Sequence, residues 1–369
     1  MRVLLISKAM IVGAYQRKAE ELAEQQGIEL TLVVPPYWDE ETRRVHLERA
    51  YTAGYELVVE PIAFSGRFHV HFYPWLHRLV DRLRPEVLHA DEEPYNLATL
   101  QMLLLARRVR AGTVFFSWQN LYRRYPFPFG AVEGYNLARF DYAVAGNADA
   151  AAVLRRKGFR RPVAVIPQFG VDPELFRPVP EDHVGSRPFT VGYLGRLVEQ
   201  KGLADLVQAA AGLAGEPRLV LIGAGPLEAE LRGRAERLGL GARLELRPAV
   251  PSTLVPKELG LLDVLVLPSR TRANWKEQFG RVLVEAMACG VPVVGSDSGE
   301  IPNVIGEAGL IFPEGDVEAL RQCLGRLQGS AEERRVLARL GRQRVLAFYT
   351  HARVAAQYAE IYRRVARCA

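Results

Sequence analysis

The sequence predicts an α/β protein with two domains, each built around a parallel β-sheet. The chain has 369 residues, which is more than one hydrophobic core usually organises and enough for two α/β units of ordinary size. Short apolar runs alternate with segments of helical periodicity along the whole chain, as in strand–helix–strand units. Because these runs lack polar alternation, we expect helices to cover both faces of each sheet.

The first domain is predicted to span residues 1–168. It opens with a strand at Arg2–Ser7, a helix over Tyr15–Gln26 and a strand at Glu29–Val34. Gly27 ends the helix, so these elements have the order of a strand–helix–strand unit. The alternation continues to the end of the domain. Further strands are expected at Val87–Ala90, Thr113–Phe116 and Asp141–Ala145, with helices from Pro94 and up to Gly158.

A change in composition separates this domain from the next. Pro and Gly accumulate between Ile166 and Pro188 without a helical or strand period, which predicts an interdomain linker at residues 169–188. A second Rossmann-like domain follows at residues 189–349, and a helix at 350–369 is expected to pack back on the first domain. Strands of the second domain are expected at residues 189–195, 218–223, 243–248, 263–268 and 291–295, with helices after Lys201, from Pro226 and from Phe279.

The composition excludes several classes of protein. The chain is 49% hydrophobic and 24% charged, which is typical of a globular protein rather than a disordered one. Its formal charge of +6 comes from arginines spread through the chain, so we expect a solvated surface and no nucleic-acid partner. Basic residues concentrate within residues 107–161, which suits phosphates on an acceptor or an anionic membrane surface, although solvated helix faces have the same pattern.

The sequence also predicts the compartment. Cys289, Cys323 and Cys368 lack the spacing of a disulfide framework or a zinc site, which fits a reducing compartment. Lys8 interrupts the apolar run at the N-terminus too early for a signal peptide. No apolar stretch approaches the ~18 residues of a spanning helix. We therefore expect a cytoplasmic protein whose membrane contact, if any, is peripheral.

Ligand-binding residues are expected in the loops that follow the strands, because ligands of open parallel sheets bind beyond the carboxyl ends of the strands. Two facing sheets would then define a cleft. In the loop after the first strand of the second domain, Gly195 allows close approach of backbone, while Arg196 and Lys201 suit a diphosphate. Solvated surface cations would give the same pattern.

A second glycine turn follows the next strand. Gly223 and Gly225 form half of a dinucleotide-binding fingerprint, but Pro226 and the residues after it supply no third glycine. A hydride-transfer cofactor is therefore disfavoured. The glycines indicate either direct contact with a ligand or a tight turn that needs a positive φ.

The third loop leads into the helix predicted from Phe279. Phe279 and Gly280 begin this helix, whose free amides and positive dipole end attract a phosphate. Glu285 lies in an otherwise apolar helix interior and needs a partner, and the two vicinal hydroxyls of a ribose would supply one. Glu277, just before the helix, is expected near whatever lies beyond the phosphate.

These motifs resemble the retaining glycosyltransferases of family 4, which have the GT-B architecture of two Rossmann-like domains facing each other across a cleft. The family signature is a pair of glutamates separated by seven residues, here Glu277 and Glu285. The resemblance covers nearly the whole chain. The matching segments are FTVGYLGRLVEQKGLADLV, VIPQFGVDPELFRP, LVLIGAGP and EQFGRVLVEAMACGVPVVGSDSGEIPNVI.

The resemblance implies a donor, a mechanism and roles for individual residues. The donor would be a nucleotide diphosphate-sugar such as a UDP- or GDP-sugar, and its hexose would pass to a sugar, lipid-linked or small-molecule acceptor with retention of configuration. Arg196 and Lys201 would bind the diphosphate and Glu285 the ribose. Glu277 and the backbone of Phe279 and Gly280 would hold the transferred sugar. Neither a metal ion nor another cofactor is implied.

The N-terminal half departs from the family pattern in two places. The loop after the first strand has a single glycine, Gly13, instead of a pair, so its contact with the diphosphate is only an expectation. Where many relatives have a histidine after the strand at Thr113–Phe116, this chain has Gln119 and Asn120. Either residue would donate a hydrogen bond near the sugar, or both serve the turn.

An acidic cluster is the best candidate for the acceptor side. His89 is followed by Asp91, Glu92 and Glu93 at the end of a strand. Three crowded acids need cationic or hydroxyl-rich partners, which an acceptor would provide, although a lone histidine is more often structural. His69, His71 and His77 either line an acceptor groove or pack on a surface loop.

Two other functions fit the same architecture. A nucleotide-sugar epimerase would need histidines and acids beside the donor motif, and the sequence does not place them there. A non-catalytic nucleotide-sugar-binding protein would not need the intact pair Glu277 and Glu285. The sequence therefore favours sugar transfer over both alternatives.

Overall fold

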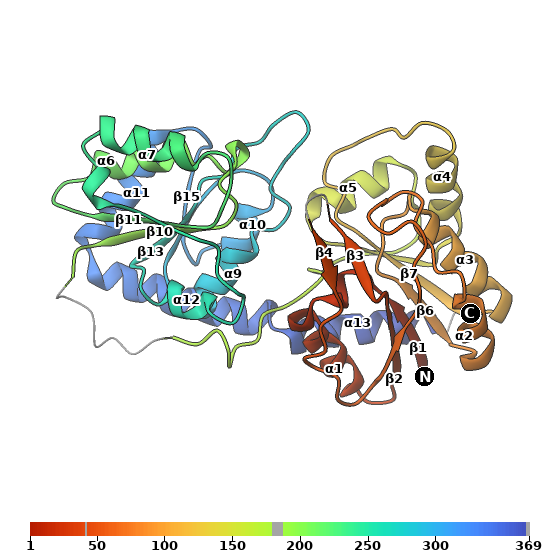
Figure 1. Ribbon diagram of the computed structural model, residues 1–369. Coiled ribbons are helices and arrows are strands. Elements are labelled where there is room, and N and C mark those ends of the chain that lie inside the picture. The colour runs from red at the N-terminus through yellow and green to blue at the C-terminus, as the bar shows by residue number, and fades with distance from the viewer. Residues whose placement is uncertain (41–42, 179–186, 367–369) are drawn as a thin grey trace. The chain divides into compact units, whose positions relative to one another are not determined.

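The protein divides into two compact units. A computed structural model describes residues 1–40, 43–178 and 187–366 (Figure 1). The first unit comprises Met1–Gly170 together with the C-terminal segment from His351, and the second comprises Val171–Thr350. Of the predicted linker, residues 171–178 belong to the second unit, while residues 179–186 lie outside the described residues, as does Cys368.

The first unit is built on a seven-stranded sheet of order β5-β2-β1-β6-β7-β8-β9, in which all neighbours pair in parallel. The strands β6, β7 and β8 are buried along their whole length, which explains their uninterrupted apolar runs. A separate antiparallel pair, β3 and β4, was not predicted. The strands are β1 (Arg2–Ile6), β2 (Glu29–Val34), β3 (Tyr37–Asp39), β4 (Arg44–His46), β5 (Glu56–Val59), β6 (Val87–Ala90), β7 (Gly112–Ser117), β8 (Tyr142–Ala145) and β9 (Val163–Val165).

Helices cover both faces of this sheet, because alternate residues of its strands enter two different cores. Val3 and Leu5 pack in one core with Tyr358 of the last helix, whereas Leu4 packs on the other face with Met102. The last helix, α13, thus belongs to the first unit although it follows the second in sequence (Figure 1). The helices are α1 (Arg17–Ala23), α2 (Leu76–Leu83), α3 (Leu97–Val109), α4 (Phe129–Arg139), α5 (Ala148–Arg156) and α13 (His351–Ala366).

The second unit contains a six-stranded sheet of order β12-β11-β10-β13-β14-β15, again entirely parallel. The predicted fold class, two α/β domains with parallel sheets, is therefore confirmed. The strands are β10 (Thr190–Leu194), β11 (Arg218–Ile222), β12 (Leu244–Arg247), β13 (Val264–Leu267), β14 (Val293–Ser296) and β15 (Leu310–Phe312). The helices are α6 (Leu203–Ala211), α7 (Glu228–Arg237), α8 (Val255–Leu259), α9 (Arg281–Ala288), α10 (Ile301–Ile305), α11 (Val317–Gly329) and α12 (Ala331–Phe348), with a short 3-10 helix, η3 (Glu199–Lys201).

The strand order places the functional loops. In the second unit β10 pairs with β11 on one side and with β13 on the other, so the direction of winding changes between β10 and β13. In the first unit the same change falls between β1 and β6. Loops that leave neighbouring strands at such a switch point begin beside each other and diverge around a ligand site. Across the described parts of the chain, no helix is both long and apolar enough to cross a membrane.

Candidate functional site

In the second unit, the segment after β10 and the segment after β13 are joined along their length. The backbone amide of Arg270 donates to the carbonyl of Gln200 over 2.9 Å. Gly202 packs against Pro268, which follows the end of β13. A Cβ on Gly202 would lie 1.9 Å from the carbonyl oxygen of Pro268. The Arg272 guanidinium binds the carboxylate of Glu199 at 2.6 Å. These contacts hold Lys201, the last residue of η3, beside the loop that carries Glu277.

Lys201 and Glu277 form a largely buried ion pair. The Lys201 Nζ lies 2.5 Å from Glu277 Oε2, and the Ser269 hydroxyl donates to the same oxygen over 2.7 Å. The side chains retain only 15% and 9% of their exposure. The backbone of Glu277 is held as well, because its carbonyl accepts the amide of Glu300 over 3.2 Å. Residues predicted from two separate motifs thus meet at one point.

The helix predicted from Phe279 begins at Arg281, directly after Gly280, and Glu285 on it already has a protein partner. Gly280 has a φ of +73° and precedes the first turn of α9. The Arg281 Nε donates to Glu285 Oε1 over 2.8 Å. Burial raises the pKa of Glu285, and Arg281 opposes that shift. This pair was not predicted from the sequence, although the spacing of four residues on one helix face could have revealed it.

Arg196 and Phe279 lie at the edges of this site. The Arg196 side chain is exposed, and its backbone carbonyl accepts the Tyr193 hydroxyl over 2.8 Å. Burial raises the pKa of Tyr193, the Glu277 carboxylate raises it further, and Arg196 lowers it. Tyr193 therefore lies within electrostatic reach of both. The ring of Phe279 meets Tyr349 edge-on at 5.8 Å between centroids.

The glycines of the two turns are explained by contact between backbones. A Cβ on Gly223, whose φ is +151°, would lie 1.9 Å from the carbonyl oxygen of Gly195. A Cβ on Gly225 would lie 2.2 Å from the carbonyl oxygen of Leu197. The turns after β10 and β11 thus pack directly on each other. Gly223 and Gly225 are therefore required by the close packing of two turns of the chain, and not by contact with a ligand.

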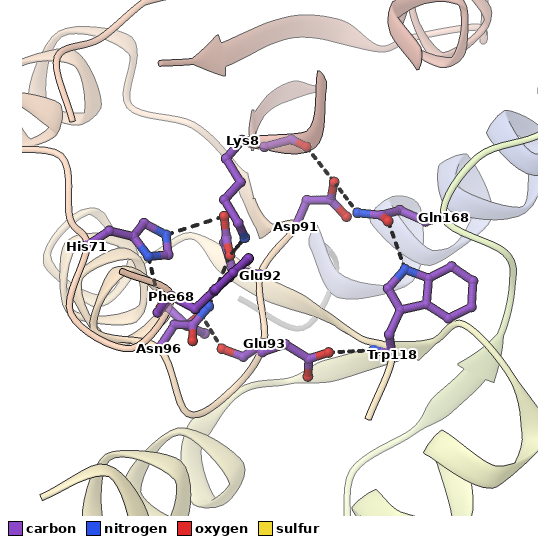
Figure 2. A network of polar contacts seen from close by, with 11 residues as sticks. Lys8, Phe68, His71, Asp91, Glu92, Glu93, Asn96, Trp118 and Gln168 are labelled. Atoms are coloured by element: carbon purple, nitrogen blue, oxygen red, sulfur yellow. Dashed lines mark hydrogen bonds and ion pairs between the residues drawn. The ribbon is translucent and has the colours of Figure 1, made fainter. Parts of the chain in front are cut away.

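In the first unit, polar side chains gather where β1, β6 and β7 end (Figure 2). The centre of this cluster is Glu92, which binds the Lys8 ammonium and accepts a hydrogen bond from Asn96 over 3.1 Å. The Nε2 of His71 lies 3.5 Å from its other oxygen. Burial raises the pKa of Glu92, but Lys8 and His71 outweigh burial and bring it to about 2. Glu92 is therefore ionised and compensated within the protein.

The two neighbouring acids have different environments. Asp91 accepts hydrogen bonds from Ser7 over 2.6 Å and from Gln168 over 2.9 Å, and burial raises its pKa. Glu93 accepts the Ser117 hydroxyl and the backbone amide of Trp118, each over 2.7 Å. Burial raises the pKa of Glu93 to about 7, although both hydrogen bonds oppose the shift. Glu93 also keeps partial exposure, which Glu92 does not.

Several residues predicted for ligand contact have structural roles instead. His89 is completely buried, with its Nδ1 2.7 Å from the Tyr362 hydroxyl and its ring stacked on Tyr358 of α13. Burial lowers the pKa of His89 well below its usual value, so the ring is neutral at pH 7. The expectation that His89 contacts an acceptor is therefore corrected to a packing role. Similarly, the amide of Gly13 donates to the Glu48 carboxylate over 2.9 Å, so this hydrogen is not available to a diphosphate.

The remaining candidates of the first unit, except His77, lie around the same sheet edge. Gln119 is buried, and its Oε1 accepts the Lys157 ammonium over 2.9 Å. Asn120 follows it and is half-buried. Of the histidines, His71 is buried in the polar cluster, whereas His69 lies 5.1 Å from the ring of Tyr95 in an aromatic group. His77 lies on α2.

Comparison with known proteins matches each half of the chain to a glycosyltransferase family. The model of the family described as "Glycosyl transferases group 1" matches residues 181–344, and that of "Glycosyltransferase Family 4" matches residues 16–175. The chain is 36% identical over 173 residues to a 2-deoxystreptamine N-acetyl-D-glucosaminyltransferase of Streptomyces fradiae, covering 43% of this chain and 39% of the relative.

A second curated relative and a solved structure are also similar to this chain. A GDP-mannose-dependent alpha-(1-6)-phosphatidylinositol monomannoside mannosyltransferase of Mycolicibacterium smegmatis is 33% identical over 46% of this chain and 47% of its own. The chain thus matches about half the length of these curated relatives, or less. The solved structure of Anabaena Alr3699/HepE in complex with UDP covers 99% of this chain and 100% of its own, with a TM-score of 0.74 and 18% identity, and shares the fold.

The protonation of Glu93 generates a pH-dependent prediction. The folded protein holds a proton on Glu93 up to about pH 7, whereas an unfolded chain releases it near the ordinary pKa of ~4.3. Because the folded state binds more protons in this window, the free energy of unfolding falls as pH rises from about 4.5 to 7. Glu93→Gln removes this contribution, so its Tm should depend less on pH across the window than that of the wild type. The exposed Glu24→Gln is the control, and equal slopes for Glu93→Gln and the wild type would contradict the assignment.

Proposed function

The chain belongs to the glycosyltransferases of group 1 and family 4, and from this membership we propose that it transfers a hexose from a nucleotide diphosphate-sugar to an acceptor hydroxyl. The observation that carries the proposal is the buried pair of Lys201 and Glu277 beside the N-terminus of α9. It places a cation, a carboxylate and the positive end of a helix at one edge of a parallel sheet. These are groups that bind a phosphate and a sugar hydroxyl together.

The diphosphate is assigned to Lys201, Arg196 and the start of α9. The ammonium has three N–H donors, so Lys201 can keep its contact with Glu277 and still donate to a phosphate oxygen. The exposed guanidinium of Arg196 offers a planar fork to the same group. Gly280, which is buried, precedes the positive end of α9. Together they would stabilise the charge that develops on the leaving diphosphate.

The two glutamates are assigned to different parts of the donor. Glu285 lies one helix turn beyond Arg281 and is proposed to accept the hydroxyls of the nucleotide ribose. Glu277 precedes the helix and is proposed to hold the sugar being transferred, with the backbone of Phe279 and Gly280. Neither carboxylate acts as an acid or base in this scheme. Catalysis would come from positioning the sugar and stabilising the leaving group.

The stereochemistry and the absence of a metal requirement are proposed from family membership. The product would keep the anomeric configuration of the donor, and turnover would persist in EDTA. Proton NMR of the isolated product gives its anomeric configuration directly, and inversion would contradict retention. Loss of turnover in EDTA that Mg²⁺ or Mn²⁺ restores would contradict metal independence.

The choice of donor is proposed from the relatives. One relative is named as GDP-mannose-dependent and another as an N-acetyl-D-glucosaminyltransferase, and the similar solved structure holds UDP. UDP- and GDP-sugars are therefore the donors to assay first. The names of these relatives include 2-deoxystreptamine and phosphatidylinositol monomannoside, so sugar, small-molecule and lipid-linked acceptors all belong in the panel.

Contact with an anionic membrane surface is proposed for the loop between β7 and α4, within the basic segment 107–161. Phe127, two residues before α4, is 89% exposed, and the exposed Arg123 and Arg124 precede it. The guanidinium of Arg156 lies 4.0 Å from the ring of Tyr122 in the same loop. An exposed aromatic ring flanked by arginines suits the interface of anionic lipids, where the ring inserts and the cations meet phosphate.

Vesicle co-sedimentation tests this contact. Wild-type protein should sediment with vesicles that contain phosphatidylglycerol and much less with pure phosphatidylcholine. Phe127→Ala and Arg124→Ala should each lower the bound fraction, because they remove the inserted ring and one cation worth about 1 kcal/mol near the surface. Phe348→Ala, which removes another exposed Phe in the second unit, is the control. Equal binding of Phe127→Ala and wild type would remove the loop from the proposal.

Two variants test the donor assignment. Glu285→Gln loses a carboxylate that accepts two hydroxyls, so affinity for UDP or GDP should fall by ~1.5–3 kcal/mol, roughly 10- to 150-fold. Glu277→Gln removes the negative charge that pairs with Lys201, and it alters only the proposed contact with the sugar. Affinity for the diphosphate should therefore stay the same or rise, while turnover falls. Calorimetry with UDP and GDP and initial rates with the matching sugars measure both effects.

The outcomes separate the functions. Transfer of sugar to an acceptor with release of the nucleoside diphosphate supports the proposal. An epimerised donor would favour the epimerase, and binding without turnover the non-catalytic protein. An equal loss of diphosphate affinity in both variants would contradict the separate roles of the two glutamates.

A further inference from the structure

The Lys201 ammonium has a second neighbour that the donor motifs do not include. Its Nζ lies 5.1 Å from the centroid of the Trp275 ring, within the range of a cation–π contact. The indole is half-buried, and Lys201 keeps only 15% of its side-chain exposure. The ammonium thus contacts a carboxylate, Glu277, and an aromatic ring.

The position of Trp275 is fixed by a short hairpin. The amide of Arg272 donates to the carbonyl of Trp275 over 2.7 Å, and the amide of Trp275 donates back over 3.2 Å. The Arg272 guanidinium is in turn bound to Glu199, the first residue of η3, which ends at Lys201. The hairpin that carries the indole is therefore tied to the same turn that carries the ammonium.

We propose that Trp275 is a positioning residue of the donor site, which holds the Lys201 ammonium ready for the diphosphate. This inference rests on the proposed function. The ring replaces part of the water around the ammonium and restricts its rotamers, so less ordering remains to be done when a phosphate binds. The Trp275 ring attracts the ammonium without accepting a conventional hydrogen bond from it. N–H groups of Lys201 therefore remain available to a phosphate.

The chemistry of the contact distinguishes a positioning role of Trp275 from a role in apolar packing alone. Trp has the strongest cation–π attraction of the aromatic side chains, Phe retains part of it, and Leu has none. A structural role would depend on apolar bulk and would not depend on the charge of Lys201. Affinity for a bare nucleoside diphosphate reports on the ammonium without involving the transferred sugar.

Calorimetry with UDP and GDP on the full chain tests the inference. Trp275→Leu should weaken binding of the preferred diphosphate by roughly 3- to 30-fold, and Trp275→Phe by less. In a Lys201→Met background, Trp275→Leu should make no further difference, because the cation it positions is gone. Trp75→Leu is the matched control, since Trp75 also lies over a cation, Arg78 at 4.5 Å, but in the first unit.

The results separate this inference from the function on which it rests. Wild-type protein that binds neither UDP nor GDP would overturn both. Wild-type binding that Trp275→Leu leaves unchanged would overturn the positioning role alone. An equal loss on Trp275→Leu with and without Lys201 would also overturn it, because the effect would then be structural. If Trp275→Leu lowers Tm, the comparison of Trp275→Phe in the two backgrounds decides in the same way.

Discussion

The proposed donor site depends on contact between backbones where the parallel strands of the second unit end. At Gly202 and Gly299 a single Cβ would lie 1.9 Å or 2.0 Å from the carbonyl oxygen of a neighbouring segment. The neighbour of Gly202 is Pro268, and the neighbour of Gly299 is Glu277 itself. This packing brings the segments that carry Lys201 and Glu277 close enough to form an ion pair. Burying two charges is costly unless they pair, so the pair and the backbone packing support each other.

The two units use charge differently at equivalent edges of their sheets. In the second unit, Arg196 stays exposed and Lys201 keeps donors beyond its contact with Glu277. In the first unit, Lys8 compensates Glu92 inside the protein. Lys18 is also buried there, 3.7 Å from the Tyr358 ring, and burial lowers its pKa to about 8 despite the opposing charge of Asp91. The three acids of this cluster thus have most of their partners within the chain, and of the three only Glu93 keeps partial exposure.

The sequence predicted the sheets well because buried parallel strands are continuous apolar runs between turn residues. It missed β3 and β4, which are short and lie outside the parallel sheets. It also missed the edge strands β5, β9 and β15, which are short and not fully buried, so they lack a long apolar run. The motifs located Lys201 and Glu277 but not their ion pair, which joins residues far apart in the sequence. The role of His89 was misjudged for the same reason, because its partner Tyr362 lies on a helix 273 residues later. Of these three pairs, Arg281–Glu285 alone could have been predicted from the sequence, because its residues are four positions apart on α9.

In the proposed donor complex, Lys201 and Glu277 mark the point where the diphosphate ends and the transferred sugar begins. A crystal structure of the protein with UDP or GDP tests it most directly. We expect a phosphate oxygen within hydrogen-bond distance of Lys201 Nζ, with the ribose hydroxyls at Glu285 and the terminal phosphate directed toward Glu277. A diphosphate bound elsewhere, with Lys201 still engaged only by Glu277 and Trp275, would contradict it.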